Sequence, residues 1–224
     1  MPFVKPPVRY TGTPTRRPLR RGTCLWRVHS QARSPRSFKS SAADPLFGGA
    51  RFDATNTDLY AYFYAALDEN TAIAETLLRD LEPDEEGMRA IPRKLVTGRA
   101  LSGLTLTKDL ELVSLVTGQD LGSIGQDGWL INAPAREYPQ TRAWAHWLRE
   151  QAAWAQGFVW SSLRDQGSLT VVLFGDRCAA GFGPDYARVL LHEVPELAVV
   201  LDDKDGAVWL NRLLEPYRAA ISPP

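Results

Sequence analysis

The sequence predicts a single domain of the α+β class, built on a mixed β-sheet. The chain has 224 residues; at roughly 150 residues per domain, one large domain or one domain with an appendage is expected. Its hydrophobic content of 44% is enough for a core without disulfides or metals. Predicted strands and helices alternate without the regular period of βαβ units, which favours a mixed sheet over a parallel one.

The first part of the chain differs from the rest in charge. Residues 1–43 hold ten basic residues and no acidic one, whereas residues 44–224 carry 16 basic and 26 acidic residues. Up to Arg21 the chain is also rich in proline and lacks apolar periodicity. We therefore expect residues 1–23 to form a basic arm, either disordered or clamped, before a domain over residues 24–224. A polyanion-binding role and a plain solvated tail are both open for this arm.

The first half of the domain is predicted to contain four strands and a helix. A short strand over residues 24–29 precedes a loop rich in Ser, Gly and Pro, and an aromatic strand follows at 59–64. Asp68 is a good N-cap, and Glu69 a favourable first-turn residue, for a helix to about Leu81. Residues 99–107 and 110–116 have the pattern of strands, and the intervening Lys108 and Asp109 favour a hairpin between them.

The second half alternates helices and strands again. Residues 140–154 are predicted to form an amphipathic helix, because Trp144, Trp147 and Leu148 stand at helical spacing. Strands are expected at 158–161, 169–174 and 197–201. A last helix should run from residue 207 to about residue 214, where the nearby Pro216 ends it.

Several functional classes lack their motifs. The chain has no P-loop, no Rossmann glycine fingerprint and no GxSxG around a serine. Its three histidines have no zinc-site spacing, so no metal is expected. Cys24 and Cys178 form no CxxC pair, which fits a reducing cytoplasm. Because no signal peptide and no long apolar run is present, we expect a cytoplasmic protein without membrane contact.

Polar residues stand in apolar company in four places: residues 25–29, 49–53, 59–60 with the helix 71–75, and 159–162. Each has an ordinary explanation. Arg27 fits an edge-strand residue that reaches water, Arg51 a loop cation, and Tyr60 a core aromatic. Glu75 lies away from the apolar face of its helix with Arg79 one turn on, as in a solvated i,i+4 pair. Periodicity and spacing alone leave the activity open.

Taken in order, these segments resemble the RES domain family, named for its Arg, Glu and Ser. The matching stretches are Leu-Trp-Arg-Val-His, Gly-Gly-Ala-Arg-Phe-Asp, Leu-Tyr, Thr-Ala-Ile-Ala-Glu and Gly-Phe-Val-Trp-Ser-Ser, between about Cys24 and Asp202. By this resemblance the name-giving residues are Arg27 or Arg51, Glu75, and Ser162. Either Ser161 or Ser162 matches the serine, and we prefer Ser162 because it stands two residues after Trp160.

The family comprises toxins of bacterial RES-Xre toxin–antitoxin systems, and its members resemble ADP-ribosyltransferases in fold and consume NAD. The resemblance therefore implies a toxin that breaks the nicotinamide–ribose bond of NAD, with water or phosphate as the acceptor. It implies catalytic roles for Glu75, Arg51 and Tyr60. It implies NAD binding by Arg27, Ser162, Arg51 and Tyr60, with NAD as a substrate and no metal.

The chemistry suits these residue types. Because nicotinamide leaves as a neutral molecule, one carboxylate can suffice, and Glu75 can hold the ribose hydroxyls and stabilise the oxocarbenium-like transition state. Arg27 and Arg51 offer forked donors to the phosphates. Tyr60 offers a flat face to the nicotinamide ring, and Ser162 a hydroxyl.

The resemblance also implies a protein partner, a cognate Xre-type antitoxin that covers the cleft. Nucleic acid would then be contacted only indirectly, through the antitoxin, and a homodimer is left open. Two alternative functions stay open as well. One is an ADP-ribosyltransferase that acts on a macromolecule, and the other is a non-catalytic module that binds nucleic acid through the basic arm.

Overall fold

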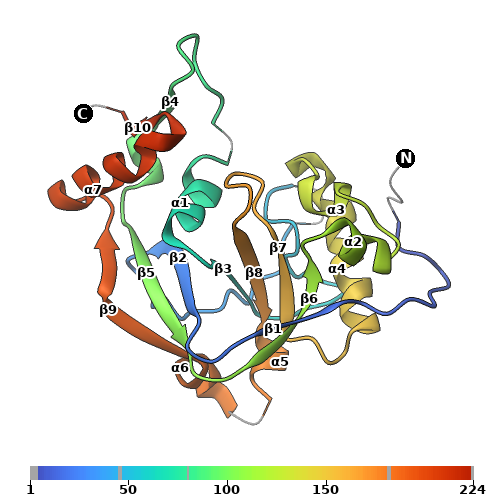
Figure 1. Cartoon of the computed structure of the whole chain (residues 1–224). Coiled ribbons are helices and arrows are strands. Elements are labelled where there is room, and N and C mark those ends of the chain that lie inside the picture. Colours follow the sequence, from blue (N-terminus) through green and yellow to red (C-terminus); the bar gives the residue numbers. More distant parts are fainter. Residues whose placement is uncertain (1–4, 45–46, 80, 181–182, 223–224) are drawn as a thin grey trace.

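A computed structural model describes residues 5–44, 47–79, 81–180 and 183–222 and has an eight-stranded mixed sheet at its centre (Figure 1). The strand order is β1-β6-β7-β8-β3-β2-β5-β9, and β6 and β7 pair in parallel within an otherwise antiparallel sheet. The predicted α+β class with a single mixed sheet is confirmed.

The strands of this sheet are β1 (Arg16–Leu19), β2 (Cys24–Ser30), β3 (Tyr62–Ala66), β5 (Arg99–Leu106), β6 (Leu110–Leu115), β7 (Gly157–Ser161), β8 (Leu169–Phe174) and β9 (Leu191–Val200). A separate parallel pair joins β4 (Arg89–Ile91) to β10 (Ala219–Ile221). The helices are α1 (Glu69–Leu77), α2 (Gly118–Ser123), α3 (Trp129–Asn132), α4 (Tyr138–Gln151), α5 (Gly175–Cys178), α6 (Tyr186–Leu190) and α7 (Lys204–Leu214). Short 3₁₀ turns cover Arg93–Leu95, Ala135–Glu137, Gly183–Asp185 and Glu215–Tyr217.

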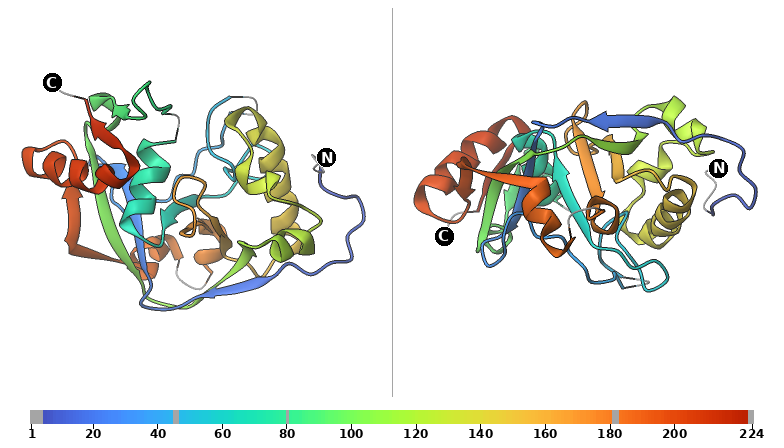
Figure 2. Two further views of the ribbon diagram at one scale, coloured as in Figure 1. Left: turned by 45° about the horizontal axis from the view of Figure 1, so that its top comes forward. Right: turned by 90° about the horizontal axis from the view of Figure 1, so that it is seen from below.

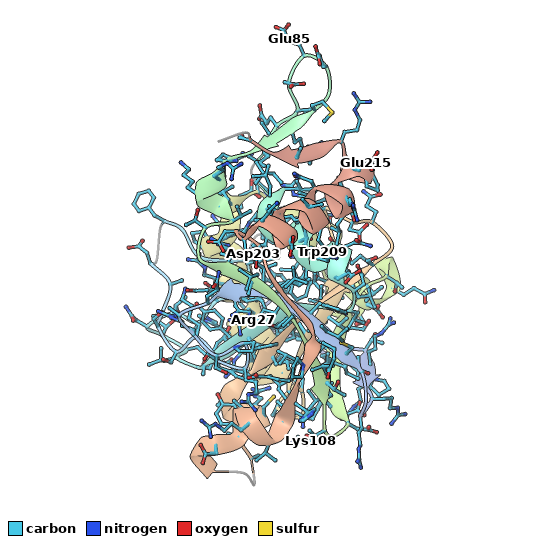
Figure 3. The ribbon with its side chains drawn as sticks, turned by 90° about the vertical axis from the view of Figure 1, so that its left-hand side faces the viewer. Arg27, Glu85, Lys108, Asp203, Trp209 and Glu215 are labelled. Carbon is cyan, nitrogen blue, oxygen red and sulfur yellow. The ribbon has the colours of Figure 1, made fainter. Side chains whose placement is uncertain are left out.

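Alternation along the strands divides the core into clusters. Phe158 and Trp160 of β7 pack with the helices at one end of the sheet, whereas Val159 between them faces the opposite side. Helices α2, α3 and α4 gather over one end of the sheet, and α1 and α7 over the other (Figure 2). On the α7 side, Trp209 packs against the cluster under α1 (Figure 3). Between these two groups of helices, the middle of the sheet is left for the candidate site described below.

Most predicted elements are confirmed with shifted ends. Asp68 caps α1 by accepting the backbone N–H of Thr71 at 2.8 Å, but the helix ends at Leu77 instead of continuing to Leu81. The aromatic strand begins at Tyr62 rather than at residue 59, and β9 starts six residues before the expected strand at 197. Helix α7 starts at Lys204 because Asp203 supplies its cap.

The predicted hairpin around Lys108 and Asp109 is wrong. Both segments are strands, but β5 pairs with β2 and β9, and β6 pairs with β1 and β7. Asp109 instead accepts the backbone N–H of Arg21 at 2.7 Å and the side chain of Arg20 at 2.7 Å. Distant segments occupy both edges of each strand, so a local turn signal could not reveal the partners.

The basic arm supplies an edge strand to this sheet. Its β1 pairs antiparallel with β6, and Tyr10 donates its hydroxyl to Ser123 O at 2.9 Å. The Arg16 guanidinium stands 4.0 Å from the centre of the Trp154 ring. Of the two states expected for the arm, the described residues are in the clamped one.

The sheet opens between β2 and β3. These strands share one register pair, Trp26 with Ala66, and diverge beyond it. Lys39 takes the place of β2 beside β3, exchanging two backbone hydrogen bonds of 2.9 Å with Tyr62. Arg27 spans the gap, because its Nη1 donates to Pro35 O at 3.2 Å and to Ser37 O at 2.6 Å. This opening borders the candidate site.

Candidate active site

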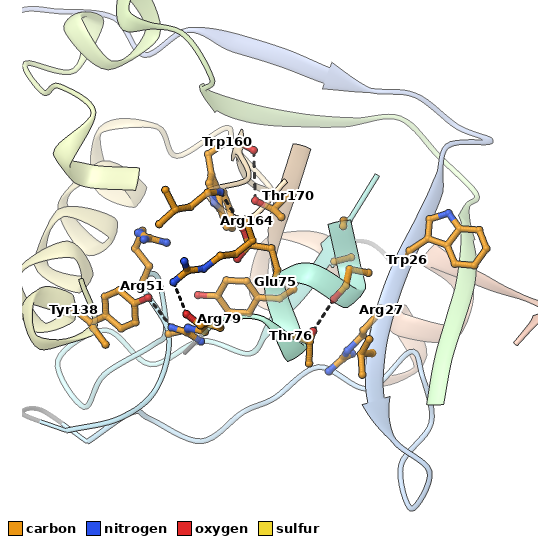
Figure 4. Close-up of a pocket in the computed structure, with 18 of the residues that line it drawn as sticks. Trp26, Arg27, Arg51, Glu75, Thr76, Arg79, Tyr138, Trp160, Arg164 and Thr170 are labelled. Carbon is orange, nitrogen blue, oxygen red and sulfur yellow. Dashed lines mark hydrogen bonds between the residues drawn. The ribbon is translucent and has the colours of Figure 1, made fainter. Parts of the chain in front are cut away.

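A cavity of about 690 Å³ lies between α1 and the segment that leads into α4, as the close-up in Figure 4 shows. Its size falls within the usual range for small-molecule and cofactor sites. Tyr64, Trp160 and Thr170, from β3, β7 and β8, form its floor. Alternation places Tyr64 and Trp160 on the helix-covered face of the sheet, which is why they reach the cavity.

The lining of the cavity is strongly basic. Six basic side chains contribute to it: Arg27, Lys39, Arg51, Arg79, Arg99 and Arg164. Among the residues that the structure describes, Glu75 is the one carboxylate in the lining. A cavity with walls of one charge attracts ligands of the other, so this one suits an anionic ligand.

Glu75 is held in place by the turn that follows β7. Its Oε1 accepts a hydrogen bond from Ser162 Oγ at 2.6 Å and another from the Leu163 backbone N–H at 3.1 Å. Its Oε2 has no hydrogen-bond partner within the described part of the chain. One oxygen is therefore fixed, and the other is available to a ligand. Glu75 is thus bound to the turn after β7 and not simply exposed to solvent.

Arg51 is 9% exposed and stands beside Tyr138, 5.2 Å from its ring centre. Its Nη2 donates to Ala133 O at 3.1 Å, while its Nε is buried without a hydrogen-bond partner among the described residues. Burial lowers the pKa of Arg51, and electrostatic interactions with Tyr138 and Glu75 partly oppose that shift. The rest of the Arg51 side chain contributes to the cavity lining.

The loop that carries Arg51 is pinned from α4. Arg142 is 1% exposed, and its Nε donates to Ala50 O at 3.1 Å. Gly49 has a φ of 74°, and an added Cβ there would lie 2.6 Å from Arg142 Nη2. Glycine is needed at this position for both reasons.

Arg27 borders the cavity at its other end. Its guanidinium lies 4.5 Å from the centre of the Phe63 ring. Burial, reinforced by the charge of Arg33, lowers the pKa of Arg27 to about 10, so it is a cation at neutral pH. Arg27, Arg51 and Glu75 are thus brought together around one cavity, as the resemblance implied.

The structure does not bring Tyr60 to this cavity. Tyr60 is 3% exposed, donates its hydroxyl to Phe52 O at 2.9 Å and lies under the Arg149 guanidinium, 3.7 Å from its ring centre. It precedes β3 and packs into the core, as its ordinary explanation predicted. Tyr64, four residues later, lines the floor instead. Alternation along the strand could not have separated the two, because both are an even number of residues from Tyr62, so the difference depends on where β3 begins.

The two serines differ in their surroundings. Ser162 is 2% exposed and contacts Glu75, whereas Ser161 lies 3.5 Å from Val116 O. Sequence reasoning missed two lining residues near them. Arg79 donates to the Tyr138 hydroxyl at 2.7 Å, and the Arg164 guanidinium donates to Arg79 O. The only sign of these two arginines in the sequence was their positive charge close to the stretches that resemble the family.

The described residues contain no group of three or more His, Cys, Asp or Glu side chains that could hold a metal ion. In the same part of the chain, no helix is both long and apolar enough to cross a membrane.

Comparisons with known proteins agree with the fold described above. The model of the RES domain family matches residues 24–196. A search among curated proteins finds no match to the chain. The chain is similar to one in the crystal structure of the M. tuberculosis MbcT–MbcA toxin–antitoxin complex, with a TM-score of 0.53 and 17% sequence identity. That similarity covers 81% of this chain and 85% of the other, and it shows a shared fold.

Proposed function

Because the chain belongs to the RES domain family, we propose that it is the toxin of a toxin–antitoxin pair and that it breaks the nicotinamide–ribose bond of NAD. The observation that carries this proposal is the state of Glu75. Its carboxylate stands in a basic cavity, with Oε1 fixed by Ser162 and Leu163 and with Oε2 available. A positioned carboxylate of this kind suits the positive charge that develops on a ribose ring.

In the proposed reaction the bond between ribose C1′ and the pyridinium nitrogen breaks, and its electron pair stays on nicotinamide. The leaving group departs neutral and needs no proton, so one carboxylate is sufficient. Glu75 Oε2 accepts a hydrogen bond from a ribose hydroxyl and stabilises the oxocarbenium-like transition state. An oxygen of water or phosphate then bonds to C1′, and a water acceptor releases its proton to solvent.

The basic lining holds the rest of the substrate. Arg51 and Arg27 line the cavity, and their planar guanidinium groups carry forked donors that match phosphate oxygens. Tyr64 takes the place that the resemblance gave to Tyr60, because its ring lines the cavity floor. Ser162 acts on Glu75 rather than on the substrate in this proposal, since it is almost fully buried.

A protein antitoxin of the Xre type is the proposed partner. The similar solved structure is described as a toxin–antitoxin complex, which supports an arrangement of this kind for the chain. Co-expression with the product of the neighbouring gene, followed by co-purification and an assay of the complex, tests the partner. An isolated chain that is equally active with and without that product would contradict this part of the proposal.

The reaction is tested by incubating the purified protein with NAD and measuring nicotinamide release. Gln at position 75 keeps an acceptor for Ser162 and Leu163 but removes the charge, so Glu75→Gln should lower kcat by about 10²- to 10³-fold. Glu150→Gln is the matched control, because Glu150 is an exposed glutamate on α4 outside the cavity. Wild-type turnover in Glu75→Gln would remove Glu75 from this role.

The acceptor and the alternative functions are separated by products. Omitting phosphate and identifying the sugar product distinguishes hydrolysis from phosphorolysis. Radiolabelled NAD followed by gel electrophoresis reveals transfer to a macromolecule as labelled protein or nucleic acid. Salt-dependent nucleic-acid binding that is lost on deletion of residues 1–23, without NAD turnover, would favour a binding module instead.

A further inference from the structure

The turn between β7 and β8, residues 162–168, lies along one face of α1. Thr71, Glu75 and Arg79 are spaced four residues apart, so they follow one another on the same side of that segment. Each contacts the turn. Thr71 Oγ1 lies 2.6 Å from Asp165 Oδ2, Glu75 accepts from Ser162 and Leu163, and Arg79 O accepts from the Arg164 side chain.

The contacts of Ser162 within the turn fix the direction of its hydroxyl. Ser162 Oγ accepts the backbone N–H groups of Arg164 at 3.1 Å and Asp165 at 3.0 Å. Both acceptor positions of the hydroxyl are then used, so its single hydrogen points to Glu75. The position of Glu75 Oε1 thus depends on the conformation of the turn at residues 164 and 165.

The contact between Thr71 and Asp165 stabilises that conformation of the turn. Thr71 is fully buried, and its hydroxyl lies 2.6 Å from Asp165 Oδ2 and 2.6 Å from Oδ2 of the N-cap Asp68, so its single hydrogen is shared between the two carboxylates and is donated to one of them at a time. Asp165 is therefore linked through its side chain to Thr71 and through its backbone N–H to Ser162.

We infer that Asp165 is a positioning residue for Glu75: its bond to Thr71 anchors the 162–168 turn, and the turn aims the carboxylate through Ser162 and the Leu163 amide. The inference rests on the proposed function, because it gives Glu75 the catalytic role. Asp165 itself is absent from the cavity lining. Its removal should therefore affect the chemical step more than substrate binding.

The kinetic test compares two variants of the full chain. Asp165→Ala removes the acceptor for Thr71 and should lower kcat by about 10- to 100-fold with KM nearly unchanged, because a small displacement of a reacting group is costly. Asp165→Asn keeps an acceptor oxygen and should restore most of kcat. An Asp165→Ala enzyme with wild-type kcat, or an equal loss in both kcat and 1/KM, would overturn the inference.

The control is Asp203→Ala, which removes a different aspartate hydrogen bond, the N-cap bond of 2.7 Å to the Gly206 N–H at the start of α7, from a residue that is also absent from the cavity lining (Figure 3). That variant should lose thermal stability but keep kcat. If it loses kcat as Asp165→Ala does, general destabilisation explains both and the inference fails.

A second measurement does not depend on turnover. Amide hydrogen exchange at Leu163 and Arg164, whose N–H groups bond to Glu75 and Ser162, should become at least about tenfold faster in Asp165→Ala and stay near the wild-type rate in Asp203→Ala. Unchanged exchange at these amides overturns the anchoring role. If wild-type protein does not consume NAD but the exchange result holds, the proposed function fails while the anchoring of the turn stands.

Discussion

Burial decides the protonation state of the side chains around Glu75. It raises the pKa of the Tyr64 phenol well above its usual value, and the charge of Asp53 adds to that shift. Tyr64 is therefore a neutral ring on the cavity floor. Arg27 keeps its charge at neutral pH although burial lowers its pKa to about 10. The cavity thus offers fixed cations and an uncharged aromatic surface over the whole range of ordinary assays.

The buried thiol of Cys178 gives a prediction at this scale. Burial raises its pKa from 9.0 to about 12. Between these values the unfolded chain releases the thiol proton and the folded chain does not, so the free energy of unfolding falls by up to about 1.4 kcal/mol per pH unit. The contribution is complete below pH 9 and is lost as the pH rises toward 12.

Denaturant unfolding of wild type and Cys178→Ala across this alkaline range checks the prediction. The variant should be less stable at neutral pH, because the substitution leaves a small void, but its stability should fall less steeply with pH. Parallel pH profiles for the two proteins would show that Cys178 ionises equally in both states.

At the level of elements, the arm is tied to the sheet by aromatic and backbone contacts. Tyr10 meets the Trp147 ring edge-on with centres 5.0 Å apart, and β1 covers the edge of β6. Pro18 is tolerated in β1 because an edge strand has one side without ladder partners. A proline-rich segment without periodicity gives no local sign of such a strand.

Deleting residues 1–23 should lower the melting temperature and promote self-association, because it uncovers the edge of β6. Nicotinamide release, measured below the new melting temperature, should persist because no lining residue comes from the deleted segment. Arg16→Ala is the milder comparison, with an expected cost of about 0.5–1 kcal/mol from its contact with Trp154. An unchanged melting temperature after the deletion would show that the arm adds no stability.

Across the whole molecule, the site is assembled from segments that are distant in sequence. Arg27, Arg51, Glu75, Tyr138 and Arg164 all line one cavity. NAD added to Glu75→Gln, which binds without turnover in our proposal, should slow amide exchange near residues 50–51, 75–79 and 163–164 together. Protection limited to one of these segments, or to the α7 end, would contradict a shared binding cavity.

Local physics explains what could be predicted from the sequence. Asp68 as a cap and the short apolar run at residues 169–174 are signals within a few residues, and the structure confirms the cap and the strand. The partners of β5 and β6 are set by contacts with remote strands, so the hairpin prediction was wrong. A helical wheel places Glu75 away from the apolar face, but it cannot distinguish a side chain that faces solvent from one that faces a cavity. The choice of Tyr64 over Tyr60 likewise depended on where β3 begins.

The order of the strands has a consequence for how the chain matures. In the sheet, β3 pairs with β8 and β5 pairs with β9. Strands from the first half of the chain can therefore pair only after strands from the second half have been synthesised. Such long-range pairing slows folding, because loop entropy is lost before contacts form. During synthesis Glu75 leaves the ribosome long before Ser162, its hydrogen-bond partner. A nascent chain would therefore gain its chemical competence only after about three quarters of its length had emerged, which leaves time for a partner to meet it first.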